Sequence, residues 1–226
     1  MGTIIIQEET TKKPISLIGK EAGVCWGANI LDEEKNYNRG LDCLLSGHGR
    51  TWEYPQVYVI LDGYSARVIR ELYTHIGGAP TRLQASTRYI KYQHGFDYVT
   101  APAIEKNEEA KQVYDDAMKH LVEAMCKLEE LGIHKEDSGM LLPLAMSTKV
   151  VLRTNLRNLI DMAHQRLCTR AYWEYRVLMR DLMKELSNYS DEWKTIVNQY
   201  FIPKCEVSGF CSERYCCGRM PKKETK

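Results

Sequence analysis

A strand-like run that leads directly into an amphipathic helix is the feature that most constrains the fold of this sequence. Residues 148–152 (Thr-Lys-Val-Val-Leu) are rich in β-branched residues and predict a strand. Apolar residues then recur at helical spacing from about Asn155 to Leu167, which predicts a helix. Its apolar positions fall on one face: Leu156, Ile160, Ala163 and Leu167. A strand and a helix joined this closely must share one hydrophobic core.

Charged residues lie on both flanks of this predicted helix. At about 100° per residue, Arg166 falls on one flank, while Arg157, Asp161 and His164 fall on the other. A guanidinium is a planar, permanently charged fork that suits phosphate or carboxylate, so the helix is suited to two binding surfaces. The alternative is an ordinary amphipathic helix whose arginines form surface ion pairs with neighbouring carboxylates.

The rest of the chain predicts more helices than strands. Residues 55–61 form a second strand candidate, closed by Asp62-Gly63. Helices are predicted over residues 15–26 and 33–46, after the capping residue Ser65, from Asn107 to Gly132, and around Trp173 and Trp193. The fold class that follows is α+β, with helices packed around a small, mostly antiparallel sheet.

Composition and charge exclude several classes of protein. The 31 basic and 30 acidic residues give a net charge of +1, which gives no reason to expect nucleic-acid binding. No apolar run approaches the roughly 20 residues of a membrane span, so no membrane association is expected. The first 13 residues lack the basic start and long apolar core of a secretory signal. A cytoplasmic location is the expectation.

The block from residue 142 to residue 174 resembles the C-terminal signature of flavin-dependent thymidylate synthases. Leu-Pro-Leu at 142–144 precedes a Thr-containing strand, then Asn155-x-Arg157, and Arg166 nine residues further on. Ala-Tyr-Trp-Glu at 171–174 resembles the Ala-Gln-Trp-Glu that members often show. The resemblance implies that Asn155 and Arg157 contact the flavin and that Arg166 holds the deoxyuridylate (dUMP) phosphate. Asp161, on the same flank as Arg157, is assigned to the cofactor-binding group.

A second family motif, Arg-His-Arg-x2-Ser-x4-Ser-x-Arg, is present in altered form at residues 74–89. Its second half is matched by four residues: Thr81, which stands in place of the first Ser, followed by Ser86, Arg88 and Tyr89. Both arginines of the Arg-His-Arg triplet are missing, two residues are inserted, and Gln replaces the usual Glu at position 84. Backbone N–H groups of the Gly-Gly-x-Pro loop at 77–80, or the side chain of Arg82, are candidate replacements.

The resemblance also implies roles for this altered segment. Ser86 and Arg88 are expected to contact dUMP with Gln84 beside it, and His75 is expected near the flavin ring. We take Ser86 and Arg166 as the candidate catalytic residues, without a nucleophile role for Ser86 because no base stands at triad spacing. The alternative for Ser86 is a turn hydroxyl that bonds its own backbone.

The resemblance covers roughly residues 14–185, with two further departures. Residues 46–54 resemble the family's Gly-His-x-Ser-Pro-x-Glu-His turn; Glu53 matches, but Tyr54 replaces the terminal His. Gly139 stands where the family often has a substrate-binding Arg. These losses bear on affinity and rate more than on the fold.

The function implied is reductive methylation of dUMP to dTMP. Methylenetetrahydrofolate would supply the carbon, FAD reduced by NADPH would supply the hydride, and the protein would be a homotetramer with shared sites. The protein's own part is positioning and charge. Two alternatives are a relative that binds flavin and nucleotide with a shifted substrate or reaction, and a non-catalytic metal-binding assembly.

The last alternative depends on the cysteines at the C-terminus. The eight cysteines include four within thirteen residues: Cys205, Cys211, Cys216 and Cys217. This spacing lacks the Cys-x2-Cys pairs of strong zinc motifs, so we assign no metal ligand and leave reduced thiols or a stray disulfide as alternatives. We therefore predict a family-like domain over residues 1–202 and a structureless Cys-rich tail over residues 203–226.

Overall fold

The computed structural model describes residues 2–75, 80–92 and 94–223. The chain divides into two compact units. Unit 1 contains Met1–Thr3, Leu61–Tyr73 and Leu83–Val150, and unit 2 contains Ile4–Ile60, Thr74–Arg82 and Val151–Lys226. Each unit is therefore built from segments that are distant in the sequence, which makes its packing dependent on long-range contacts.

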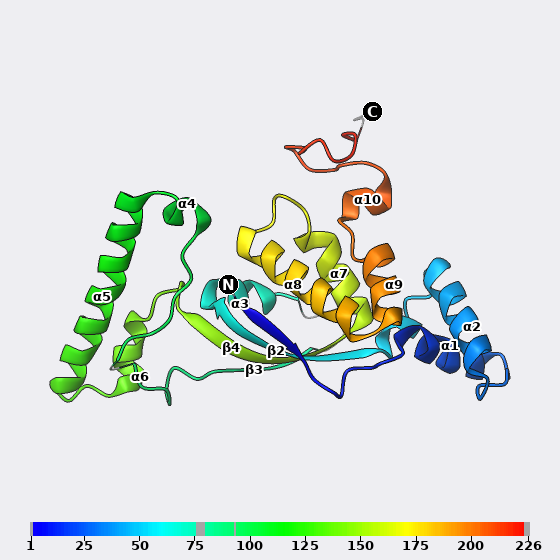
Figure 1. Ribbon diagram of the computed structural model, residues 1–226, viewed down its shortest axis with the longest axis horizontal. Coiled ribbons are helices and arrows are strands. Elements are labelled where there is room, and N and C mark those ends of the chain that lie inside the picture. Colours follow the sequence, from blue (N-terminus) through cyan, green and yellow to red (C-terminus); the bar gives the residue numbers. More distant parts are fainter. Residues whose placement is uncertain (1, 76–79, 93, 224–226) are drawn as a thin grey trace. The chain divides into compact units, whose positions relative to one another are not determined.

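A four-stranded sheet with the order β1-β2-β4-β3 runs through the chain (Figure 1). Its strands are β1 (Thr3–Ile6), β2 (Gln56–Ser65), β3 (Thr81–Gln84) and β4 (Ser147–Asn155). The longer helices are α1 (Pro14–Cys25), α2 (Glu33–Leu45), α3 (Ala66–Leu72), α5 (Glu108–Glu130), α7 (Leu156–Arg166), α8 (Trp173–Tyr189) and α9 (Asp191–Tyr200). Short helices are η1 (Thr51–Glu53), α4 (Pro102–Glu105), α6 (Lys135–Ser138), η2 (Gly139–Leu141) and α10 (Lys204–Ser208). The α+β class is confirmed.

The strands differ from the sequence prediction in extent and in number. β2 does not close at Asp62-Gly63 but continues to Ser65, because Gly63 adopts a φ of +76° within the strand. β1 and β3 were missed, since each has only four residues and too short a pattern. In β4, by contrast, side chains alternate between exposed and buried, as a strand with one covered face requires.

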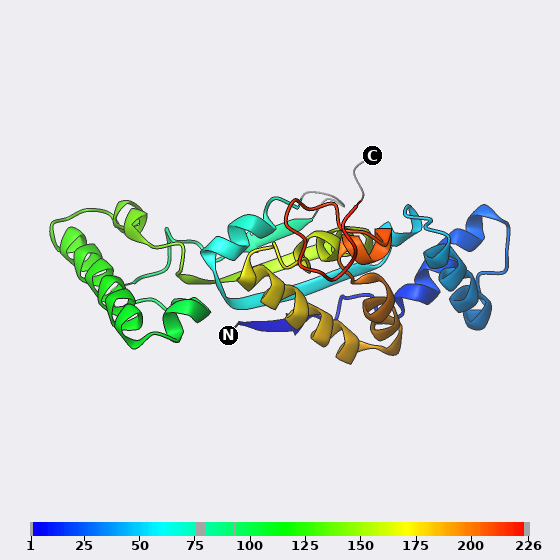
Figure 2. The same cartoon turned by 90° about the horizontal axis from the view of Figure 1, so that it is seen from above.

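Unit 2 is built around α7, α8 and α9. The predicted apolar face of α7 is confirmed for Leu156, Ile160 and Ala163, which are buried, whereas Leu167 is half-buried. α8 and α9 lie side by side in both ribbon views, and Trp193 at the start of α9 is fully buried (Figure 2). Each large side chain buried in this way stabilises the unit by about 1.5–3 kcal/mol. Trp173, the other expected anchor, is only half-buried because it is the first residue of α8.

At the N-terminal side of unit 2, α1 and α2 form a closely packed pair (Figures 1 and 2). Gly19 and Gly40 allow this approach, because a Cβ at either position would lie within 2 Å of a backbone oxygen of the facing helix. Glu192 of α9 accepts hydrogen bonds from the backbone N–H groups of Ile15 and Ser16 and thereby fixes the start of α1. The helices predicted at 15–26 and 33–46 are confirmed.

Unit 1 contains α3 and α5. Ser65 caps α3 through the N–H of Val68, and Asn107 caps α5 through the N–H of Ala110, as predicted. Apolar residues recur at helical spacing along α5, but they are not all covered: Met118 is buried, whereas Val113 is 67% exposed. Other positions of this pattern are buried or half-buried: Leu121, Met125 and Leu128.

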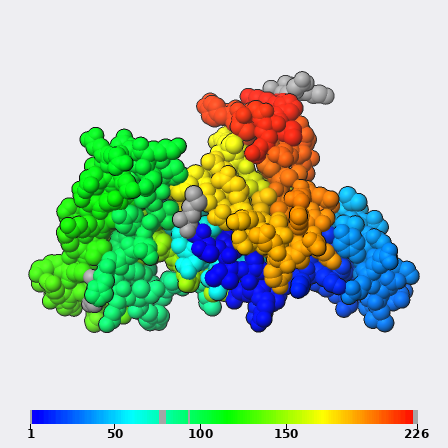
Figure 3. Space-filling model, in the orientation of Figure 1, coloured from blue at the N-terminus to red at the C-terminus, as the bar shows by residue number. Residues whose placement is uncertain are grey.

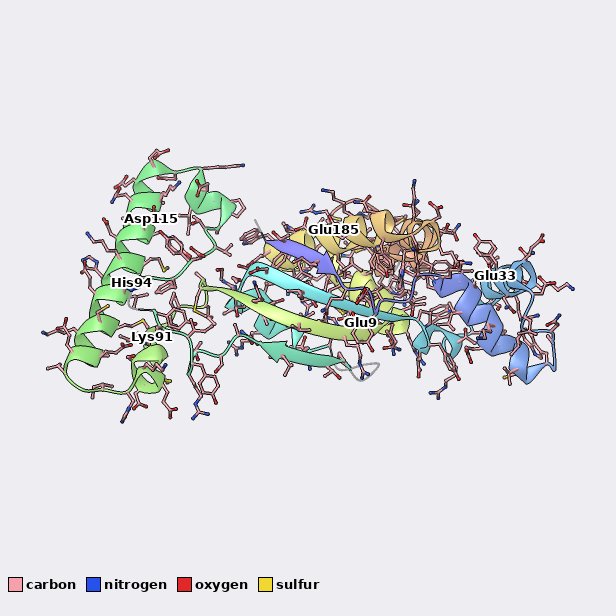
Figure 4. The ribbon with its side chains drawn as sticks, turned by 60° about the horizontal axis from the view of Figure 1, so that its bottom comes forward. Glu9, Glu33, Lys91, His94, Asp115 and Glu185 are labelled. Atoms are coloured by element: carbon pink, nitrogen blue, oxygen red, sulfur yellow. The ribbon has the colours of Figure 1, made fainter. Side chains whose placement is uncertain are left out.

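The segment between β3 and α4 runs beside α5 within unit 1. Figure 4 labels Asp115 on the helix and His94 and Lys91 on the segment. Tyr98 donates its hydroxyl to Asp115 at 2.7 Å, which fastens the two together. Edge-to-face rings continue the contact: Tyr92 with Phe96, Phe96 with Tyr98, and Tyr98 with Tyr114.

The C-terminal tail is not structureless, so that expectation is wrong. α10 covers Lys204–Ser208, and Cys211 is buried and forms a parallel bridge with Lys222. In the space-filling view these residues, in red, form a compact lobe (Figure 3). Gly209 supplies the positive φ of 76° that ends the helix and turns the chain. Within the described residues, no helix has the length and apolar character needed to cross a membrane.

Candidate functional site

The junction between β4 and α7 positions the first predicted flavin-binding residue. Asn155 is the N-cap of α7, and its side-chain oxygen accepts a hydrogen bond from the N–H of Asn158 at 2.9 Å. Asn158 in turn donates to the hydroxyl of Thr154 at 2.7 Å. All three side chains are buried. Asn155 therefore orients the first turn of α7, in addition to any role toward a ligand.

Arg157, in the first turn of α7, contacts Glu53, the residue that matches the upstream motif. Its Nη1 lies 2.7 Å from Oε1 of Glu53, and the two side chains are 48% and 31% exposed. The backbone of Gly49 lies close to the guanidinium of Arg157. A Cβ added to Gly49 would lie 3.7 Å from Cζ of Arg157. The turn at 46–54 and the Asn-x-Arg motif thus meet within unit 2. The ion-pair alternative raised for the arginines of α7 applies to Arg157.

Arg166, at the last turn of α7, has a different environment. Its Nε donates to Nε2 of His75 at 3.0 Å, and its Nη2 donates to the hydroxyl of Thr74 at 3.4 Å. His75 is buried with only 9% of its surface exposed. These two contacts orient the guanidinium.

The ring of Tyr175 completes the cluster around Arg166. Cζ of Arg166 lies 4.6 Å from the centroid of this ring, within the range of a cation–π contact. The edge of His75 meets the same ring, with centroids 5.8 Å apart. Tyr175 lies in the core, with no exposed surface. A rigid aromatic surface and a buried imidazole therefore hold one guanidinium in a defined orientation.

Burial and neighbouring charge keep His75 neutral. Desolvation, Arg166 and Arg82 together lower the pKa of His75 from 6.5 to about 4. Because Nε2 accepts from Arg166, the ring proton resides on Nδ1 near pH 7. Arg82, named above as a candidate replacement for the missing arginines, is thus close enough to His75 to act on its charge.

A cavity of about 710 Å³ lies beside this cluster, entirely within unit 2. Arg166, Asp161 and His164 all line it on the α7 side. The expectation that Arg166 faces a different surface from Asp161 and His164 is therefore wrong, because the cavity extends around the last turns of the helix. The opposite lining comes from the C-terminal tail, including Cys211 and Cys217. Burial lowers the pKa of His164, with Asp161 opposing the shift. A volume of this size accommodates a ligand as large as a nucleotide.

The altered motif residues of unit 1 have weak or exposed partners within that unit. Nε2 of Gln84 donates to the hydroxyl of Thr148 at 3.3 Å. The hydroxyl of Ser86 accepts a hydrogen bond from the N–H of Arg88 at 3.3 Å, which is the turn geometry raised as the alternative for this residue. Arg88 pairs with Glu136 at 2.9 Å, but the side chains are 64% and 51% exposed. Such an exposed pair contributes about 0–1 kcal/mol.

The predicted site residues therefore fall into separate groups. His75 and Arg166 are brought together in unit 2, and Arg157 meets Glu53 in the same unit, while Gln84, Ser86 and Arg88 belong to unit 1. The proposed N–H donors at 77–79 lie outside the described residues. Tyr175 was missed, although it directly follows the recognised block at 171–174; only its position beneath Arg166 reveals its part.

In the described part of the chain, no three or more His, Cys, Asp or Glu side chains are grouped so that they could hold a metal ion. The described cysteines form no disulfide with one another. The structure thus offers no support for a metal-binding assembly. The cations, amides and hydroxyls described above are donors suited to anionic organic ligands.

Comparison with known proteins identifies the family. The family model described as "Thymidylate synthase complementing protein" matches residues 8–189. A flavin-dependent thymidylate synthase from Nitratidesulfovibrio vulgaris is 28% identical, with 95% of this chain and 94% of the relative covered. The same enzyme from Pyrococcus horikoshii is 31% identical over 74% of this chain and 70% of its own length. The relatives thus match between 74% and 95% of the chain, not only the recognised block.

Solved structures show the same fold. A UMP/dUMP methylase from Streptomyces cacaoi, bound with 5-Br dUMP, has a TM-score of 0.73 at 15% identity over 89% of this chain and 97% of that chain. Thymidylate synthase X from Helicobacter pylori, with FAD and dUMP, has a TM-score of 0.68 at 16% identity over 88% and 100%. The fold and the family match agree: this chain belongs to the thymidylate synthase complementing protein family, whose relatives named here are flavin-dependent thymidylate synthases.

Proposed function

We propose that this chain catalyses the reductive methylation of dUMP to dTMP, with FAD as cofactor and methylenetetrahydrofolate and NADPH as co-substrates. Two relatives named flavin-dependent thymidylate synthase match 95% and 97% of this chain. The observation that carries the proposal is the cluster of Arg166, His75 and Tyr175 at the edge of a nucleotide-sized cavity. Arg166 is the residue for which the family motif implies a phosphate-binding role.

Arg166 is proposed as the anchor of the dUMP phosphate. A phosphate is bound best by a guanidinium whose orientation is fixed before the ligand arrives, because little side-chain entropy is then lost. The hydrogen bond to His75 and the ring of Tyr175 supply that fixed orientation. The neutral state of His75 matters here, since an imidazolium could not accept this hydrogen bond and would repel the guanidinium.

FAD is proposed to bind at the start of α7, around Asn155 and Arg157. The residues present fit a dinucleotide: the guanidinium of Arg157 is half-exposed beside the backbone of Gly49, and Asn155 and Asp161 belong to the same helix. Arg157 would direct its charge to the cofactor, with Glu53 keeping the side chain extended. His75 is proposed near the flavin ring. When bound, the flavin supplies the hydride, and the protein supplies orientation and exclusion of water.

Ser86, Arg88 and Gln84 are proposed as further contacts to dUMP. Their partners are exposed or weak, so these side chains are free to exchange a local contact for a ligand at small cost. A Gln at position 84 would contact the pyrimidine without adding a negative charge. Ser86 would orient the uracil ring and would not act as a nucleophile.

A homotetramer in the cytoplasm is part of the same proposal, by similarity to the family. Sedimentation velocity of the FAD-loaded protein tests the assembly, with a mass four times that of the 26.1 kDa chain as the expected result. Fractionation of cells that produce the full chain tests the location. A monomer at micromolar concentration would contradict the shared-site arrangement.

The direct test of the reaction is product formation by purified protein. The protein is loaded with FAD and mixed with NADPH, methylenetetrahydrofolate and dUMP, and dTMP is measured by chromatography. We expect dTMP to form only when all four are present. UMP in place of dUMP should give no methylated product, whereas a relative with a shifted substrate would accept it. Failure to take up FAD, or failure of the gene to rescue a thymidine auxotroph, would contradict the proposal.

A further inference from the structure

The C-terminal tail is attached to the end of α7 by several contacts, all within unit 2. Arg219 donates to the carbonyl of Leu167 at 3.3 Å and pairs with Glu206 at 3.4 Å. Arg170, just after α7, pairs with Glu213 at 3.1 Å. These contacts place the tail as one wall of the cavity that Arg166 lines on the other side. The individual pairs are half-exposed and weak, so the position of the tail depends on how its own loop is held.

Two cysteines of this loop meet at the same short stretch of backbone. The N–H of Cys211 donates to the carbonyl of Pro221 at 2.7 Å, and the N–H of Lys223 donates to the carbonyl of Cys211 at 2.9 Å. The thiol of Cys216 donates to the carbonyl of Met220 at 3.2 Å. The backbone of Cys211 and the thiol of Cys216 are thereby both held at residues 220–223.

The thiol of Cys211 also lies within hydrogen-bonding reach of the thiol of Cys216. A backbone hydrogen bond from Glu213 lowers the pKa of Cys211, but burial and a hydrogen bond with the thiol of Cys216 raise it, and the net direction is upward. The N–H of Gly218 donates to the sulfur of Cys216 at 3.4 Å. This hydrogen bond holds the sulfur in a fixed position for thiol–disulfide exchange.

We propose that Cys211 and Cys216 form a dithiol modification site that a low-molecular-weight disulfide oxidises to an intramolecular disulfide, which fixes the tail as a wall of the cavity. One thiolate attacks the external disulfide, forms a mixed disulfide and releases one small thiol. The second cysteine then displaces the other small thiol. Two cysteine thiols and one external disulfide thus become one protein disulfide and two small thiols, with electrons and protons balanced.

Cys217 is the obvious competitor for the same reaction. It is exposed, and hydrogen bonds from Thr169 and from the N–H of Arg219 lower the pKa of its thiol. Its thiol, however, is directed toward Thr169, whereas the thiol of Cys216 lies within hydrogen-bonding reach of that of Cys211. Geometry therefore favours the pair 211–216 over a pair that includes Cys217.

The full chain treated with glutathione disulfide near neutral pH tests the proposal. We expect the mass to fall by about 2 Da with two thiols lost, and peptide mapping to join Cys211 to Cys216. Hydrogen exchange at the amides of Cys211 and Lys223 should slow roughly tenfold or more, because the cross-link restricts the opened tail. Neither readout depends on the nucleotide chemistry proposed above.

Matched variants separate the pair from its neighbours. Cys216→Ser should lose the cross-link, whereas Cys217→Ser and Cys25→Ser, an exposed cysteine of α1, should keep it. A cross-link that includes Cys217, or only mixed disulfides with glutathione, would overturn the assignment. A cross-link at 211–216 that leaves both amide exchange rates unchanged would overturn its effect on the tail.

Discussion

The cluster around Arg166 and the segment around Ser86 and Arg88 carry the two family motifs, but they are built in opposite ways. Arg166 is held by a buried imidazole and a buried aromatic ring. Arg88 is paired across an exposed surface, and Ser86 bonds its own turn. Arg166, from the motif that matches without gaps, has buried partners, one of which is His75 from the altered motif. Ser86 and Arg88, from the second half of the altered motif, have replaceable partners.

This difference indicates which losses the site tolerates. A residue with buried partners cannot change without leaving a polar group or a cavity behind. An exposed residue changes at almost no cost in stability, so its replacement affects only the ligand. We therefore expect binding energy for the phosphate to be concentrated in unit 2, with unit 1 adding smaller, adjustable contacts.

The largest expected effect is that of Arg166→Ala on nucleotide affinity. Removing a preorganised guanidinium should weaken dUMP binding roughly 100-fold, because a charge-assisted contact to phosphate is lost. FAD binding should be unchanged. Calorimetry on the FAD-loaded protein measures both, and Arg70→Ala, on the exposed surface of α3, removes the same charge as a control. Equal dUMP affinity in wild type and R166A would contradict the claim that the cluster around Arg166 provides most of the binding energy for the phosphate.

The second effect is on stability below neutral pH. Since the pKa of His75 is lowered from 6.5 to about 4 in the folded protein, the unfolded state binds the proton first as pH falls. Stability of roughly 3 kcal/mol is therefore present above pH 6.5 and lost progressively between pH 6.5 and 4. Urea denaturation across this range measures it.

The control for this pH effect is a pair of histidine variants. His75→Gln should flatten the pH dependence, because glutamine accepts a hydrogen bond and does not titrate. His120→Gln, at an exposed position on α5, should leave it unchanged. If H75Q and wild type lose stability in parallel, His75 is not the neutral partner of Arg166 described above.

Arg157 provides an intermediate case on the same helix. Arg157→Ala should lower FAD affinity roughly tenfold while changing the free energy of unfolding by less than about 1 kcal/mol, because the pair with Glu53 is half-exposed. Fluorescence quenching of added FAD measures the first and urea denaturation the second. Arg50→Ala removes the other, more exposed arginine that pairs with Glu53 and should leave FAD affinity intact. Equal losses in both variants would assign the effect to Glu53 instead.

Tyr175→Leu sharpens the comparison because it removes the aromatic support of Arg166, although it also leaves a cavity in the core. Leucine keeps an apolar side chain in the core but removes the ring beneath the guanidinium. We expect dUMP affinity to fall about fivefold, in proportion to a cation–π contact. Tyr189→Leu, at the end of the same helix, is the matched control and should retain dUMP affinity.

The smallest effect is expected in unit 1. Arg88→Ala should reduce dUMP affinity about threefold and change stability by less than about 0.5 kcal/mol, since its partner Glu136 is exposed. Glu136→Gln should leave dUMP affinity unchanged or improve it, because it releases Arg88. A loss in R88A as large as that in R166A would remove the distinction between the two regions.

Local patterns predicted the elements with strong periodicity and clear caps. Asn107, Asn155 and Ser65 cap the helices that they were expected to begin, and the buried face of α7 follows from its spacing. The short strands β1 and β3 depend on pairing with distant segments and leave no local signal. The order of the tail was missed because it depends on contacts with the end of α7.

The site was predictable only in its residue types. Motif spacing singled out His75, Arg157 and Arg166, but it could not show that a neutral imidazole holds Arg166 or that Arg157 meets Glu53. These pairs join residues 91 and 104 positions apart in the chain. Tyr175 lacked any signal beyond its place after the recognised block. Contacts of this kind follow from tertiary packing, which one sequence does not encode in local spacing.

Affinities of dUMP and deoxyuridine for the FAD-loaded wild type and for Arg166→Ala test the central claim most directly. The two ligands differ only by the phosphate. We expect dUMP to bind wild type roughly 100-fold more tightly than deoxyuridine, and this ratio to fall close to one in the variant. A ratio that stays the same in both proteins would show that Arg166 does not hold the phosphate.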